Sequence, residues 1–195
     1  MASNLKFLSF ILITGLFFSS CKKDPETVSG CTDPLGDNYN AEATIDNSTC
    51  TFQKRFLGDY DGTFTCDGIF KSVFSTAVLS ITELIKKDEV NIIIQSTIGP
   101  LPVMGKLTKN EVTVDATLQN LSIKPGDIYN GAGDTPILAD GKVKTVLTLS
   151  ADNKTLTGVI NVTLIAKEPI IISGIILFPA GTALPDMCDF VGKKK

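Results

Sequence analysis

The chain has 195 residues and a formal charge of −3, with 18 basic and 21 acidic side chains scattered along it. A nucleic-acid-binding surface needs a basic patch, so this charge pattern argues against a nucleic-acid partner. The sequence contains no histidine and no tryptophan. The missing histidine excludes catalytic triads with an imidazole base, HExxH zinc sites and haem ligation through histidine.

Residues 1–20 have the layout of a secretory signal peptide. Lys6 gives a positive start, residues 7–18 are mostly apolar, and Ser19 and Ser20 precede a cysteine. The apolar run is about a dozen residues long, whereas a membrane-spanning helix needs about 20. We therefore expect a cleaved signal and not a transmembrane helix.

Ser19-Ser20-Cys21 resembles the lipobox of bacterial lipoproteins, although Phe18 stands where that motif usually has an aliphatic residue. The resemblance implies cleavage before Cys21, a diacylglycerol on the Cys21 thiol, and an exported protein anchored by lipid to the outer membrane. The alternative is ordinary signal cleavage that leaves Cys21 as a spare thiol.

Residues 21–29 are polar and read as a flexible tether. The segment also resembles the charged stretch that follows the lipid cysteine in Bacteroidota lipoproteins, where an acidic cluster directs the protein to the cell surface. Asp24 and Glu26 are the acidic residues here. The resemblance implies surface exposure.

Four cysteines remain when Cys21 is assigned to lipid, and in an oxidising compartment an even set indicates disulfides with three possible connectivities. We favour Cys31 with Cys50 and Cys66 with Cys188, because each pair then staples one region of the chain. A four-cysteine zinc site is the alternative, but no CxxC pair is present to begin one.

Residues 30–53, which open on Gly30-Cys31-Thr32-Asp33-Pro34, resemble a short cysteine module that recurs in secreted Bacteroidota proteins. The segment is too short for a hydrophobic core, so a disulfide and turns must hold it. Its five side-chain oxygen donors are the hard ligands that calcium prefers. The alternative is that they cap turns in a polar spacer. The five residues are Asp33, Asp37, Asn38, Asn40 and Asp46.

From Phe56 onward the apolar residues alternate with polar ones, which predicts strands joined by hairpins. No window carries a convincing helical period. Residues 125–141, rich in Gly, Pro and Asp, are the longest expected loop. The expected strands are 60–66, 73–82, 90–96, 103–107, 112–118, a short one at 121–123, 143–149, 156–164, and a closing strand at 184–190.

The stretch from Ile170 to Phe178 is apolar at nearly every position and lies between two prolines. It reads as one strand with two dry faces, which a barrel interior, a packed sheet, a partner or a ligand must cover. Because monomers seldom expose such patches, we expect the rest of the chain to cover it.

The expected fold over residues 55–191 is all-β: an antiparallel up-and-down meander that closes into a barrel of about eight strands, with a sandwich as the alternative. Tyr60-Asp61-Gly62-Thr63-Phe64 and the hairpins resemble the calycin-like and lipocalin-like barrels of Bacteroidota lipoproteins. That resemblance implies an interior for a small apolar ligand and no catalytic residue.

Three functions follow from these expectations. The first is a non-catalytic binding module for a small apolar ligand or an extracellular partner, which makes contact through the barrel mouth or residues 125–141. The second is a structural or accessory envelope lipoprotein without a ligand. The third and weakest is a hydrolase that uses paired carboxylates, since histidine chemistry is unavailable to this chain. No cofactor is expected, unless calcium binds the module.

Overall fold

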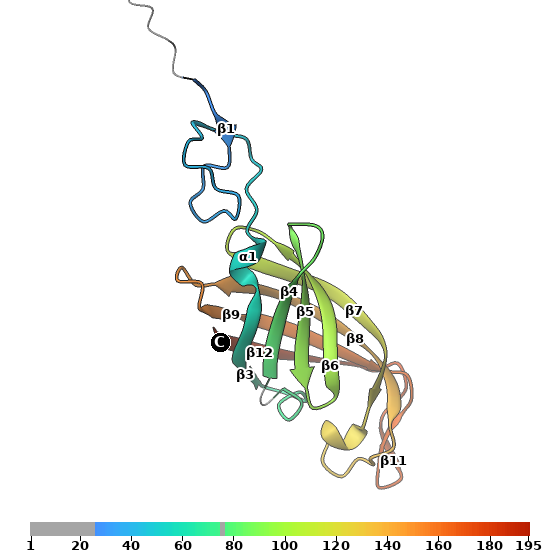
Figure 1. Ribbon diagram of the computed structural model, residues 1–195. Helices are drawn as coiled ribbons and strands as arrows, with labels where there is room; N and C mark the ends of the chain where they lie inside the picture. The colour runs from blue at the N-terminus through green and yellow to red at the C-terminus, as the bar shows by residue number, and fades with distance from the viewer. Residues whose placement is uncertain (1–25, 75–76) are drawn as a thin grey trace, which may run out of the picture.

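The computed structural model describes residues 26–74 and 77–195 (Figure 1). Eight long strands follow one another along the chain: β3 (Gly58–Cys66), β4 (Ala77–Glu83), β5 (Glu89–Ser96), β6 (Gly99–Leu107), β7 (Glu111–Ile123), β8 (Ile137–Leu149), β9 (Thr155–Ala166) and β12 (Ala183–Lys194). Each strand pairs antiparallel with its neighbours, and β12 lies between β9 and β3 so that the sheet closes. The predicted closed up-and-down barrel is confirmed.

The two-residue period that predicted the strands also forms the core. In β8 the inward residues are buried from Ile137 to Leu149, while Lys142 and Lys144 point outward. Burying an aliphatic side chain contributes about 1.5–3 kcal/mol. A one-residue slip in register would turn both lysines into the core, so the alternation fixes the pairing.

Most strand boundaries differ from the predicted ones by a few residues, and three of these differences change the connections between strands. β4 begins at Ala77, because Val73 and Phe74 are buried in the turns of the β3–β4 connection. β7 runs unbroken through the predicted 121–123 strand, with its register shifted between Leu118 and Leu121. β8 begins at Ile137, so the loop predicted for residues 125–141 is shorter, and it holds the short 3-10 helix η1 (Pro125–Asp127).

A small module precedes the barrel. Two short parallel strands, β1 (Ser29–Gly30) and β2 (Ile45–Asp46), lie beside a disulfide between Cys31 and Cys50. One helical turn, α1 (Gln53–Phe56), connects the module to β3. Figure 1 shows the module at one end of the barrel, next to α1. The predicted signal peptide and Cys21 lie outside the described residues.

The barrel has two distinct ends. The module end carries the β4–β5, β6–β7 and β8–β9 turns together with the C-terminus. The far end carries the β3–β4 connection, the β7–β8 loop, and a hairpin of β10 (Ile170–Ile172) and β11 (Ile175–Phe178) between β9 and β12. In Figure 1 the hairpin and the module lie at opposite ends of the barrel. Among the described residues, no helix is both long and apolar enough to span a membrane.

Candidate functional site

Helix α1 closes the module end of the barrel. The Gln53 side chain is buried, and its amide nitrogen donates hydrogen bonds to the carbonyl oxygens of Leu84, Lys86 and Glu89 at 2.9, 3.2 and 2.7 Å. These three bonds tie α1 to the β4–β5 turn. Phe56, the last residue of α1, is fully buried in the core.

Arg55 joins the same helix to the two other turns at this end. Its guanidinium donates to the carbonyl oxygen of Lys109 at 2.8 Å and to the side-chain oxygens of Asn110 and Asn153 at 3.0 and 2.7 Å. The side chain is 8% exposed. Burial of a charge requires such hydrogen bonds, so Arg55 holds the module end together and is not free to bind an anion.

The interior of the far half of the barrel is apolar and almost filled. Its cavity leaves about 20 Å³ for the centre of a water molecule, and its lining includes Phe64, Phe70, Phe74, Ile98 and Leu121. A single water needs roughly 10–15 Å³ measured in this way, so the space accommodates about one water and no lipid-sized ligand. The interior for an apolar ligand that the resemblance implied is therefore not open in this conformation.

The apolar stretch Ile170–Phe178 forms a hairpin and not the predicted single strand. The prediction that the rest of the chain covers it is wrong for its outer part. Ser173 and Gly174 turn it, with φ angles of 52° and 81°. At its base Ile170 is buried, while Ile172 and Phe178 pack against the core. The rings of Tyr129 and Phe178 form a tilted pair with centroids 5.1 Å apart.

The outer part of the hairpin is exposed. Ile171 and Ile176 oppose each other on one face, Ile175 lies near the turn on the other, and Leu177 lies at a register shift. The exposed fractions of Ile171, Ile175, Ile176 and Leu177 are 45%, 71%, 56% and 45%. The prediction failed because a run of apolar residues does not reveal that Ser173 and Gly174 fold it back on itself away from the barrel wall.

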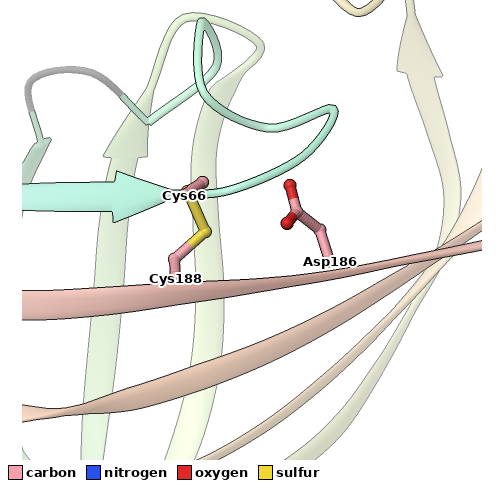
Figure 2. Close-up of side chains that lie close together, drawn as sticks. All are labelled: Cys66, Asp186 and Cys188. Atoms are coloured by element: carbon pink, nitrogen blue, oxygen red, sulfur yellow. A yellow bond between two sulfur atoms is a disulfide. The ribbon is translucent and has the colours of Figure 1, made fainter.

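The far end also holds a buried disulfide beside a carboxylate (Figure 2). Cys66 on β3 is bonded to Cys188 on β12, the pairing that the sequence favoured, and ligand atoms of Cys66, Cys188 and Asp186 lie within 4.8 Å of one another. Both sulfurs are in the disulfide, so no thiolate is available for a metal. Asp186 instead accepts backbone N–H bonds from Gly68 at 3.0 Å and Phe70 at 2.8 Å. It fastens the β3–β4 connection to β12.

The five oxygen donors of the module are dispersed among local contacts. Asp33 and Asn40 accept backbone N–H bonds from residues two positions further on, as does Asp46. Asp37 accepts from the Lys54 backbone N–H at 3.0 Å, and Asn38 from that of Thr51 at 2.9 Å. Within the described residues, no three of the carboxylates come as close together as the Cys66 group does. These contacts are those of turn-capping residues.

Asp33 makes one further contact, to the barrel. Its carboxylate pairs with Lys109 Nζ on the β6–β7 turn, at 2.5 Å. The bond from Lys109 and the Leu35 N–H lower the pKa of Asp33 below its ordinary value. Asp33 therefore links the module to the barrel. The calcium site at the five residues of the module stays a prediction.

Comparison with protein-family models, with curated proteins and with solved structures finds no match to this chain. Among the described residues the buried polar side chains are Gln53, Arg55 and Thr145. Sequence reasoning did not single out Gln53 or Arg55, because their partners lie 31 to 98 residues further along the chain. A signal for the hairpin was present in the dipeptide Ser173-Gly174, which is typical of turns.

Proposed function

We propose that this protein is an exported, lipid-anchored and non-catalytic binding protein of a bacterial envelope. Its lipid attachment would be on Cys21, and its contact surface would be the β10–β11 hairpin at the far end of the barrel. One observation supports this surface above the barrel interior: four large aliphatic side chains are exposed on the hairpin, while the cavity accommodates only about one water.

The order of the parts along the chain also supports the proposal. A tether, a stapled module and a barrel follow the predicted lipid cysteine, and the exposed hairpin lies at the end of the barrel opposite the module (Figure 1). An anchor on the module side would therefore present the hairpin away from the membrane that holds it. Two disulfides agree with an exported protein, since cytosolic proteins rarely keep them.

The second candidate is a structural or accessory envelope lipoprotein that binds nothing. The nearly filled interior favours it over a carrier of small apolar molecules, because a carrier needs a chamber of several hundred cubic ångströms, roughly 300–1,000 Å³. The two candidates differ in what they require of the hairpin, which only a binding protein needs to keep accessible.

Two measurements on the full chain expressed in a bacterial host test the proposal. The mature protein should begin at Cys21, and its measured mass should include the added acyl chains. Cys21→Ala should move the protein out of the membrane fraction. On intact cells, Ser173→Cys should react with a membrane-impermeant maleimide. An unmodified Cys21 would contradict the lipid anchoring. A Cys at position 173 that reacts only after lysis would contradict the presentation of the hairpin at the cell surface.

A further inference from the structure

We propose that the β10–β11 hairpin inserts its tip into a lipid surface of uncharged headgroups. This inference rests on the proposed function, because it names what occupies the contact surface. The experiment below uses protein without the lipid anchor, so its failure would leave the anchoring and the surface presentation of the hairpin standing.

Apolar side chains lie on both faces of the hairpin tip. Ile171 and Ile176 cover one face of the hairpin, and Ile175, 71% exposed, points from the opposite face. A flat protein surface covers only one face of such a ribbon. An acyl-chain environment surrounds both faces and the turn, so it matches a protruding tip that is apolar on two sides.

The hairpin and the residues on either side of it form an uncharged stretch of sequence. No charged residue occurs from Pro169 to Pro185, and Ser173 and Thr182 are the polar side chains in that run. Protein interfaces usually have a rim of polar and charged side chains, and within the hairpin itself Ser173 is the polar side chain that could supply one. The nearest basic residue before it, Lys167, is paired with Asp140 at 2.8 Å and donates to Asn120 at 2.7 Å. Lys167 is therefore already engaged in contacts within the chain, so contact with an uncharged lipid surface does not depend on it.

The exposed apolar area of the hairpin is too small for a stable dimer interface. The exposed fractions of the four aliphatic residues correspond to on the order of 400 Å² of surface, the size of patch that is often functional on a monomer. Two copies that buried these patches against each other would remove roughly 800 Å², which is below the ~1,000 Å² that a specific protein interface needs. A second copy of this chain is therefore a poorer occupant than a lipid surface.

The backbone limits the depth of insertion. Among the described residues β11 pairs only with β10, so the outer edge of β11 has no strand beside it. Unpaired backbone groups are costly in the hydrocarbon core. Insertion of about 5–10 Å keeps that edge within reach of headgroups and water while the aliphatic side chains enter the acyl boundary.

The test uses the chain from Lys22 onward, with both disulfides formed, and vesicles of phosphatidylcholine with and without phosphatidylglycerol. We expect the protein to float with both kinds of vesicle, with little dependence on salt. Ile176→Asn should weaken the partition by roughly tenfold or more. Met104→Asn is the matched control, because Met104 lies on the outer wall of β6 and is 57% exposed against 56% for Ile176.

The lack of tryptophan provides a second readout. Ile176→Trp places a single tryptophan in the hairpin, and its emission should shift to shorter wavelength when vesicles are added, whereas that of Met104→Trp should not. Three results would overturn the inference: no flotation, equal flotation of Ile176→Asn and wild type, or a dimer in the absence of vesicles that Ile176→Asn abolishes. The last result would identify the hairpin as a self-association surface.

Discussion

Cys66 and Cys188 lie directly opposite each other where the first strand of the barrel, β3, meets the last, β12. Their side chains are 3% and 0% exposed. The disulfide therefore locks the seam along which a meander must close to become a barrel, and it joins residues 122 positions apart in the chain. Closure of so long a loop restricts the unfolded chain strongly, in the chain-entropy account of disulfides.

Removal of this crosslink should destabilise the barrel. We expect the Cys66→Ala/Cys188→Ala variant to lose roughly 3–5 kcal/mol of unfolding free energy. The measurement is urea denaturation, in which the midpoint and the dependence of the free energy on urea concentration are compared with those of wild type. The matched control is Cys31→Ala/Cys50→Ala, which should leave the barrel transition nearly in place and open the module to protease. Equal losses in the two variants would show that the seam disulfide has no special role in closure.

Arg55 should be as important to the module end as the disulfide is to the seam. Arg55→Met keeps much of the side-chain volume but removes the bonds to Lys109, Asn110 and Asn153, and we expect a loss of roughly 2–4 kcal/mol in unfolding free energy. Lys54→Met is the control, since Lys54 is exposed on the same helical turn and should change stability by less than about 0.5 kcal/mol. Similar urea midpoints for the two variants would contradict this role.

The contrast between Arg55 and β8 shows what sequence could reveal. Alternation along β8 is a local signal, and because each apolar residue has to face the core, it gives the strand, its face and its register together. Arg55 and Gln53 carry no such signal. Their partners are turns far along the chain, which become neighbours only after the barrel closes.

The prediction that the Ile170–Phe178 stretch is covered failed for a different reason. Apolar composition predicts burial, and Ile170, Ile172 and Phe178 do pack against the core. Composition does not say how many residues the wall can accommodate, and the turn at Ser173-Gly174 sends Ile175 and Ile176 outward. Exposed apolar residues conflict with a stable monomer, and such conflicts are expected at functional sites.

Calcium should leave the module unchanged. Asp33, Asp37 and Asp46 are each engaged in separate contacts, and within the described residues no three carboxylates of the module lie close enough together to share an ion. We expect no shift in the thermal unfolding of the chain from Lys22 onward when calcium is added, and no heat of binding by calorimetry. A rise in the melting temperature that Asp33→Asn abolishes would restore the calcium site.

Tyr60 should make stability fall at high pH. Its ring is fully buried and its hydroxyl donates to the Phe56 carbonyl oxygen at 2.9 Å. Burial raises the pKa of Tyr60 from 10.0 to about 12, partly offset by the positive charge of Arg55. The folded state thus holds the proton more tightly than the unfolded state. The resulting stability is complete below pH 10 and is lost as the pH rises towards about 12.

Two measurements check this expectation. Absorbance titration of the tyrosines should show a late phase near pH 12 that is missing in Tyr60→Phe, and the urea midpoint of wild type should fall between pH 10 and about 12. Tyr60→Phe should start from a lower midpoint, because it lacks the bond to Phe56, and should fall less steeply over the same interval. Parallel curves for the two proteins would mean that another group controls the alkaline transition.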